Sequence, residues 1–369
     1  MDIAIVGLSL KLPNDINNLD DLYNKIKNKT DCISEHPVDR FNLGSYYDDS
    51  NKIGKINTKK GGYLKNIYDF DNEFFSISTK EAKTMDPQQR ILLELVFEAI
   101  QDGNISNISN SKTGVFIGSC NTEYFSNQSE DSTFCNEYSI TGGLLTLLSN
   151  RISYYYNLKG PSLTVDTACS SSGYALHLAC KSILSNESDM CIVGGSNLIL
   201  NPETTVGFSQ GQFLSPDGNC KSFDQSANGY VRSEGCVILM LKKLESAIKD
   251  NNKIYAVIKN SSINQDGKTD SLTMPNVKQQ QKLLKECYKD VDLDELTFIE
   301  AHGTGTNLGD KIEATSLGNI LGKNRKDKIK IGSIKSIIGH TEATSGLAGI
   351  CKAILMIKKR KLTKIIVFL

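Results

Sequence analysis

The sequence predicts an α/β protein in which helices cover both faces of the β-sheets. Short apolar runs alternate with amphipathic segments from one end of the chain to the other, a pattern typical of such proteins. The 369 residues are 39% hydrophobic and 23% charged, a balance typical of a soluble globular protein with a sizeable core. Only seven prolines are present, and no linker rich in proline, glycine or serine divides the chain. We therefore expect one large domain or two ordinary ones.

Eight apolar runs predict strands. They lie at residues 3–7, 114–118, 162–166, 190–195, 236–244, 254–263, 297–301 and 328–333. A weak break at residues 245–253, ESAIKDNNK, is the best candidate for a junction. We therefore divide the chain into an N-terminal half, residues 1–248, and a C-terminal half, residues 249–369.

Two helices are predicted with defined beginnings. The first runs from Pro87 to about Gln101, with Asp86 as its N-cap, proline at the first helical position and Gly103 just past the end. The second begins at Cys169, directly after the strand SLTVD, and its apolar positions share one face. This second helix therefore follows a strand-to-helix turn.

Charge and cysteine usage exclude several functional classes. Forty-two basic residues balance forty-two acidic ones, so no global field would recruit nucleic acid or an anionic membrane, and we expect neither as a partner. The apolar run in MDIAIVGLSLKLPND is too short for a signal peptide or a membrane span. The ten cysteines form no CxxC pair, which argues against both a zinc site and a secreted disulfide framework. We expect a cytoplasmic protein without a metal.

Cys169, in VDTACSSSG, is the first candidate catalytic residue. At a strand-to-helix turn its sulfur would meet the first backbone N–H groups of the helix, and the positive end of the helix dipole favours a thiolate there. Hydrolases use the same geometry to expose a nucleophile, and Ser170, Ser171 and Gly173 are small enough for an acyl group to approach. A buried structural cysteine is the alternative.

Two of the four histidines also lie in loops of small residues that follow predicted strands. They are His302 in EAHGTGTNLGD and His340 in GSIKSIIGHTEATSG, and active-site groups collect in such loops. His36 and His177 lack this context, so we assign them no catalytic role. HGTGT lacks the spacing and the terminal Lys-Ser/Thr of a phosphate-binding loop, which argues against nucleotide binding.

These three motifs resemble the active-site motifs of β-ketoacyl synthases, specifically the ketosynthase domain of type I polyketide synthases. MDPQQRILLELVFEAIQD, LSPDGNCKSFDQSANGYVRSEG and SSINQDGKTDSLTMPN resemble further blocks of that family in the same order, from residue 3 to about Arg360. The resemblance implies a thiolase-like fold of five layers, αβαβα, built from two similar βαβαβ halves. It also implies a homodimer formed through the strand that precedes the nucleophile.

The resemblance assigns roles to the candidate residues. Cys169 matches the nucleophile that accepts an acyl chain from an acyl carrier protein, while His302 and His340 match the pair that promotes decarboxylation of a malonyl extender. Both roles are chemically reasonable, since a thioester needs a soft nucleophile and imidazole N–H groups can stabilise an enolate oxygen.

Four further positions match supporting residues of the family. Lys335 matches a lysine that maintains the electrostatics of the site through a carboxylate, for which Glu313 in GDKIEA is our candidate. Thr304 and Thr306 match threonines that contact the phosphopantetheine arm. The resemblance implies no bound cofactor, because the substrates are phosphopantetheine thioesters on an acyl carrier protein. No carrier motif occurs here, so the carrier would be on another chain.

The end of the sequence departs from the family pattern. After GLAGICKAILMIKKRKLTKIIVFL no segment matches the glycine- and phenylalanine-rich loop that supplies a second oxyanion-hole N–H group in the family. We therefore expect an incomplete second half. Loss of one oxyanion donor lowers the rate by about two to three orders of magnitude. A truncated, weakly active or inactive remnant that at most dimerises is therefore the alternative function.

Two other classes share part of the chemistry. A degradative thiolase would need a second catalytic cysteine late in the chain, but Cys351 falls inside a predicted helix. A cysteine protease has no use for a grouping of two histidines and a lysine, and neither histidine loop resembles a groove for a substrate strand. The sequence therefore favours an enzyme that transfers acyl groups and forms carbon–carbon bonds.

Overall fold

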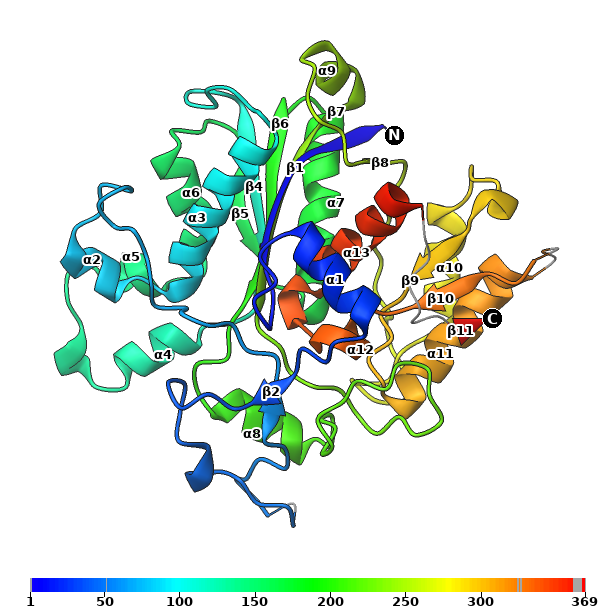
Figure 1. Cartoon of the computed structure of the whole chain (residues 1–369), viewed down its shortest axis with the longest axis horizontal. Coiled ribbons are helices and arrows are strands. Elements are labelled where there is room, and N and C mark those ends of the chain that lie inside the picture. The colour runs from blue at the N-terminus through cyan, green and yellow to red at the C-terminus, as the bar shows by residue number, and fades with distance from the viewer. Residues whose placement is uncertain (1, 51, 324, 326, 361–366, 369) are drawn as a thin grey trace.

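A six-stranded sheet forms the centre of the first half (Figure 1). The computed structural model describes residues 2–50, 52–323, 325, 327–360 and 367–368. The strand order is β5-β4-β6-β7-β1-β8. The strands are β1 (Ile3–Lys11), β4 (Thr113–Gly118), β5 (Ser162–Val165), β6 (Met190–Asn197), β7 (Gly235–Lys243) and β8 (Ala256–Ile258). β4 pairs in parallel with β5 and β6, and the other pairings are antiparallel.

Both faces of this sheet are buried, because alternate side chains of each inner strand enter different cores. In β1, Ile3 and Ile5 join one core, while Ala4 and Val6 join the other. The helices α1 (Leu19–Asn28), α7 (Ser171–Leu184) and α13 (Ser345–Lys359) contribute to the first core. The helices α3 (Pro87–Asp102) and α6 (Leu147–Tyr155) contribute to the second. The sheet therefore lies between two helical layers.

A smaller sheet lies on the far side of α13 (Figure 1). In the part of the chain that the structure describes it has three strands, β9 (Phe298–Glu300), β10 (Lys330–Gly332) and β11 (Val367–Phe368), in the order β11-β10-β9. The helices α10 (Val277–Cys287) and α11 (Asn307–Leu317) pack together beside it. Since α13 contacts both α7 and β9, the two sheets share one middle helical layer. This is the predicted five-layered, thiolase-like arrangement.

The remaining elements are short. The helices are α2 (Thr79–Thr84), α4 (Glu123–Ser129), α5 (Ser139–Gly143), α8 (Glu203–Gln210), α9 (Leu244–Lys249) and α12 (Lys335–Ile338), and the strands β2 (Ser34–Glu35) and β3 (Lys60–Gly61) pair with each other. Within the described residues, no helix is both long and apolar enough to cross a membrane.

The predicted strands and first helix are present, with one large difference in length. Asp86 caps α3 as expected, since its side chain accepts a hydrogen bond of 2.8 Å from the backbone N–H of Gln88. The run 254–263 forms only β8, because this edge strand pairs with β1 alone and its continuation from Ser262 lines a cavity. β8 follows the junction that we placed at residue 248, yet it extends the sheet of the first half.

Candidate active site

Cys169 lies in a sharp turn between β5 and α7. Ala168 has φ +52°, a left-handed conformation that a residue with a side chain rarely adopts. We expected the helix to begin at Cys169, but a 3₁₀ turn at Ala168–Ser170 comes first and α7 begins at Ser171. The reason is this tight reversal, which resembles the strained elbow that exposes a nucleophile in hydrolases.

Side chains of the turn satisfy its own backbone groups. The Ser171 hydroxyl donates to the Ala168 carbonyl oxygen at 2.6 Å and accepts from the Thr167 N–H at 2.9 Å. The Asp166 carboxylate accepts from the Ala168 N–H at 2.9 Å. Ser345, at the beginning of α13, donates to the carbonyl oxygen of Cys169 at 3.0 Å. The nucleophile candidate is therefore held mainly by neighbours in sequence.

His302 follows β9 and is held by a carboxylate from α11. Glu313 accepts hydrogen bonds from the backbone N–H groups of His302 at 2.7 Å and Gly303 at 2.8 Å. Gly303 has φ +45°, and a Cβ there would lie 2.8 Å from the Cβ of Ser333, so a glycine is needed at this bend. Glu313 is thus a brace for the His302 loop, in addition to the electrostatic contribution that we expected.

His340 is held by a segment from the first half of the chain. Its N–H donates to the Val231 carbonyl oxygen at 2.8 Å, and its own carbonyl oxygen accepts from the Ser233 N–H at 2.9 Å. The ring nitrogen Nδ1 accepts a hydrogen bond of 3.1 Å from the backbone N–H of Glu342. Since Nδ1 accepts, the proton of the neutral ring is on Nε2. His340 therefore presents a hydrogen-bond donor on the opposite side of its ring.

The structure brings Cys169, His302 and His340 together. The Cys169 sulfur and one ring nitrogen of each histidine all lie within 4.8 Å of one another. The two imidazole rings meet edge to face, with their centroids 5.3 Å apart. One sulfur and two imidazole nitrogens can also bind zinc, but a metal would need the lone pair of the nitrogen that carries the proton in His340. The hydrogen bonding thus favours a donor site over a metal site.

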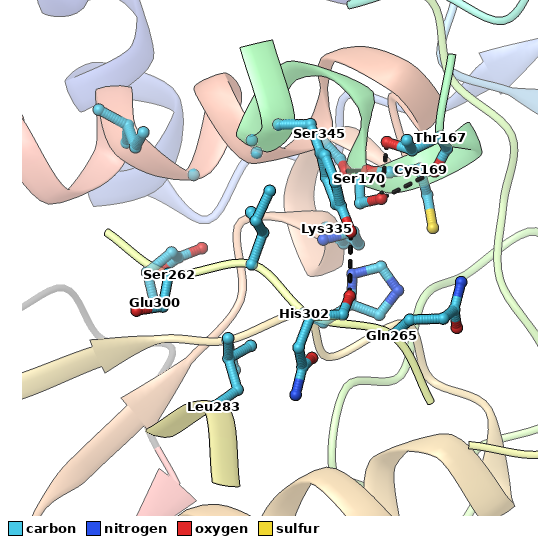
Figure 2. A pocket seen from close by; sticks show the side chains of 18 of the residues that line it. Thr167, Cys169, Ser170, Ser262, Gln265, Leu283, Glu300, His302, Lys335 and Ser345 are labelled. Atoms are coloured by element: carbon cyan, nitrogen blue, oxygen red, sulfur yellow. Dashed lines mark hydrogen bonds between the residues drawn. The ribbon is translucent and has the colours of Figure 1, made fainter. Parts of the chain in front are cut away.

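A cavity of about 810 Å³ opens beside Cys169 and His302, whereas His340 lies behind its lining residues. Figure 2 shows Cys169, His302, Lys335, Gln265 and Leu283 among the side chains that line it. Thr304 and Thr306 are not among its lining residues, and their hydroxyl groups lie 3.0 Å apart in a mutual hydrogen bond. The cavity therefore reaches the candidate nucleophile, whereas the two threonines lie outside its lining.

Desolvation and the positive charge of Lys335 keep the histidines neutral. Desolvation, assisted by the ammonium group of Lys335, lowers the pKa of His302 to about 3, although its side chain remains accessible from the cavity. The same two causes, with smaller contributions from His302 and Arg232, lower the pKa of His340 well below its usual range. Both rings are therefore uncharged at neutral pH and can act as hydrogen-bond donors.

Cys169 differs from our expectation of a favoured thiolate. Burial raises the pKa of its thiol, and the opposing effect of the Lys335 ammonium does not cancel that of burial. Desolvation thus outweighs the positive charge beside the thiol. Burial also lowers the pKa of Lys335, although the carboxylates of Glu300 and Glu313 act in the opposite direction. The resting site therefore holds a thiol beside a buried lysine.

A buried ion pair behind the site was not predicted from the sequence. Lys352 in α13 is fully buried, and its Nζ lies 2.6 Å from a carboxylate oxygen of Glu300 in β9. The other oxygen of Glu300 accepts from the Ile334 N–H at 2.6 Å, next to Lys335. Glu300, rather than Glu313 alone, thus supplies negative charge to Lys335. The signal in the sequence that could have indicated this ion pair is Lys352 itself, a lysine in an otherwise apolar helical pattern.

The residues that we left out of the site have other partners. The ring of His36 hydrogen-bonds to Tyr63 and Phe41, and that of His177 bonds to Ser261. Cys351 is fully buried within α13, which agrees with its rejection as a second catalytic cysteine.

Two family models match the chain. Residues 1–247 match the N-terminal domain of β-ketoacyl synthases, and residues 255–368 match their C-terminal domain. The second match extends to residue 368, and the comparisons do not favour the remnant over the condensing enzyme.

Similar proteins are much longer polyketide synthases. A reducing polyketide synthase of Gibberella moniliformis is 44% identical over 358 residues, which cover 95% of this chain and 15% of that protein. Polyketide synthase 37 of Dictyostelium discoideum is 43% identical over 369 residues, covering 97% of this chain and 12% of that protein. The chain thus spans about one seventh of these relatives or less.

Solved ketosynthases share the fold. The oxazolomycin ketosynthase domain of Streptomyces albus superposes with a TM-score of 0.92 at 34% identity, over 98% of this chain and 63% of that one. The ketosynthase from module 6 of the bacillaene synthase of Bacillus subtilis gives 0.89 at 36% identity, over 98% and 62%. The chain therefore belongs to the β-ketoacyl synthase family and resembles the ketosynthase domains of polyketide synthases.

Proposed function

We propose that this chain is a β-ketoacyl synthase that extends an acyl chain on Cys169 by decarboxylative Claisen condensation with a malonyl-acyl carrier protein. The observation that carries the proposal is the convergence of Cys169, His302 and His340 within 4.8 Å of one another. One group suits nucleophilic attack, and the other two suit stabilisation of a developing oxyanion.

The first step is acyl transfer. The Cys169 thiolate attacks the carbonyl carbon of an acyl-pantetheine thioester, a new carbon–sulfur bond forms, and the pantetheine thiolate leaves and takes up a proton. Because the pKa of Cys169 is raised, the thiolate is a minor species, and the nearby Lys335 ammonium favours it electrostatically.

The second step is decarboxylation and condensation. The bond between the malonyl α-carbon and its carboxylate breaks, CO₂ leaves, and the electron pair remains as an enolate. The Nε2–H group of His340 donates to the enolate oxygen, and His302 provides the second imidazole donor. The enolate carbon then attacks the Cys169 thioester, a carbon–carbon bond forms, and the sulfur leaves.

The proposal includes an acyl carrier protein as partner, since its phosphopantetheine arm would bring both the acyl and the malonyl groups. The cavity is open to solvent and reaches Cys169, as this delivery requires. Thr304 and Thr306 would contact the arm once their mutual hydrogen bond is exchanged for one to pantetheine. No other cofactor is needed.

A homodimer is the second part of the proposal. β5 is an edge strand of the large sheet, its four residues are only half-buried, and it directly precedes the Cys169 turn. An edge strand with unpaired backbone groups can pair with a second copy of itself. Tyr154 of the adjoining helix α6 is 86% exposed, which provides an aromatic group beside this edge.

We also place the protein in the cytoplasm. All ten cysteines are free in the structure, and most are buried. Unpaired thiols are typical of a reducing compartment.

The function is tested by mixing the purified chain with an acyl-pantetheine thioester and a malonyl-acyl carrier protein. We expect a β-ketoacyl product on the carrier protein, two carbons longer, with release of CO₂, and no product from Cys169→Ala. A folded wild-type protein that forms neither product nor Cys169 adduct would instead support the inactive remnant.

A further inference from the structure

His340 is followed by a backbone turn that is strained. Glu342 has φ +43°, a left-handed conformation that is strained for a residue other than glycine. In this conformation its N–H donates to Nδ1 of His340 at 3.1 Å. The turn therefore determines which nitrogen of His340 carries the proton.

A buried arginine holds the side chain of this strained residue. The guanidinium of Arg232 donates from Nε to one carboxylate oxygen of Glu342 at 2.6 Å and from Nη2 to the other at 3.0 Å. Arg232 is 4% exposed and Glu342 is 8% exposed, so this two-pronged pair lies within the protein. Such pairs are geometrically specific because two parallel hydrogen bonds fix both groups.

The arginine is itself fixed from two other directions. Its Nη1 donates to the Thr205 hydroxyl at 2.6 Å, and its Nη2 lies 3.7 Å from a carboxylate oxygen of Glu123. The residues on either side of Arg232 bond to the backbone of His340 itself. One short segment of the first half therefore holds both His340 and the residue that orients its ring.

We infer that Arg232 and Glu342 are positioning residues for His340: their ion pair holds the strained turn whose N–H fixes the ring with its proton on Nε2. This deepens the proposed function, since only that tautomer offers a donor to the enolate. With the turn released, Nδ1 of the ring would lose the N–H group that donates to it, the proton could move to Nδ1, and Nε2 would then face the site with a lone pair instead of a donor.

The sharpest test compares Glu342→Ala with Glu342→Gly. Both remove the carboxylate while Glu123 remains near Arg232, but only alanine keeps the strain, because glycine adopts a positive φ readily. Spectra of the protein labelled with ¹⁵N in its histidine rings report the tautomer directly. The signal of His340, one of four histidines, is identified by its disappearance in His340→Asn.

In the wild type we expect His340 to carry its proton on Nε2 alone. Glu342→Ala should show both tautomers, and Glu342→Gly should keep the wild-type signal. In Glu342→Ala we expect condensation to fall about 10- to 100-fold, with acylation of Cys169 close to wild type. A purely structural role would lower both half-reactions together, in proportion to the folded fraction.

A second variant tests the arginine, with a matched control elsewhere. Arg232→Met should lose the single tautomer. Arg232→Met/Glu342→Gly should regain it, because the unpaired Glu342 carboxylate and the strain are both removed, while Glu123 keeps its hydrogen bonds from the backbone N–H groups of Leu200 and Asn201. Arg40 forms the same two-pronged pair with Glu234, at 2.9 Å in both bonds, and both side chains are fully buried. Arg40→Met should reduce stability but leave the His340 signal unchanged.

The inference is overturned if Glu342→Ala and Glu342→Gly give the same His340 signal, or if Arg40→Met changes that signal as Arg232→Met does. Because the tautomer is measured without substrate, this test is separate from that of the proposed function. A protein that shows the Arg232-dependent tautomer but never condenses would retain the positioning pair and refute the synthase.

Discussion

The two sides of the candidate active site are held in different ways. The Cys169 turn is braced mainly by its own sequence neighbours, through Asp166 and Ser171. The histidine side is braced from a distance, since His340 bonds to residues 231 and 233. A local brace can be recognised in a short motif, whereas a distant one requires the folded chain. The difference also predicts that the two half-reactions can be separated by mutation.

The largest effect should come from the nucleophile itself. In Cys169→Ala no acyl adduct can form, so intact-mass spectrometry after incubation with an acyl-pantetheine thioester should show the unmodified mass. Cys120→Ala is the control, because burial raises the pKa of that thiol to about 12. Its adduct should match that of the wild type. An adduct that persists in Cys169→Ala would place the nucleophile elsewhere.

The next largest effect should come from the buried ion pair on the histidine side. Lys352→Met leaves Glu300 as an uncompensated buried carboxylate and should lower the free energy of unfolding by about 3–5 kcal/mol. Lys352→Met/Glu300→Leu, measured in the same denaturant titration, should recover most of this loss. If the single variant unfolds at the wild-type denaturant concentration, this pair does not brace the site.

Lys335 links the two sides, and its removal should change the pH dependence of acylation. The reactive thiolate of Cys169 increases as pH rises, and its raised pKa places this increase at a higher pH than in a free thiol. Lys335→Met removes the positive charge that favours the thiolate, so the midpoint of the acylation rate against pH should move upward. An unchanged or lower midpoint would show that Lys335 does not act on Cys169.

The smallest effect should come from the local brace. Ser171→Ala removes two hydrogen bonds of the Cys169 turn and should cost about 1 kcal/mol of stability, because solvent or neighbouring groups replace them in part. Thermal unfolding measures this cost. Acylation should slow while the decarboxylation of malonyl-carrier protein stays near wild type. Equal losses in both reactions would remove the distinction between the two sides.

Much of this site could be predicted from sequence because its motifs are short. Cys169 and His302 each follow a predicted strand closely, His340 follows one after the short helix α12, and the structure brings all three together. The raised pKa of Cys169 could not be predicted, because it depends on burial by distant segments. The Glu300–Lys352 pair was missed for the same reason, since 52 positions separate the two residues in sequence.

The fold was predictable where alternation is strong and less so at its edges. β1, β6 and β7 are buried on both faces, and their long apolar runs marked them clearly. β8 was predicted too long, because an apolar run does not show where an edge strand leaves its only neighbour. The domain division at residue 248 stays a prediction, as do the catalytic roles.

The most direct test is to follow one sample through both half-reactions in His340→Ala. The variant is first incubated with acyl-pantetheine, and malonyl-carrier protein is then added while intact mass is recorded. We predict that the Cys169 adduct forms and then persists, whereas in the wild type it is consumed as the β-ketoacyl product appears. Consumption of the adduct at the wild-type rate would contradict the account, because His340 would then contribute nothing to condensation.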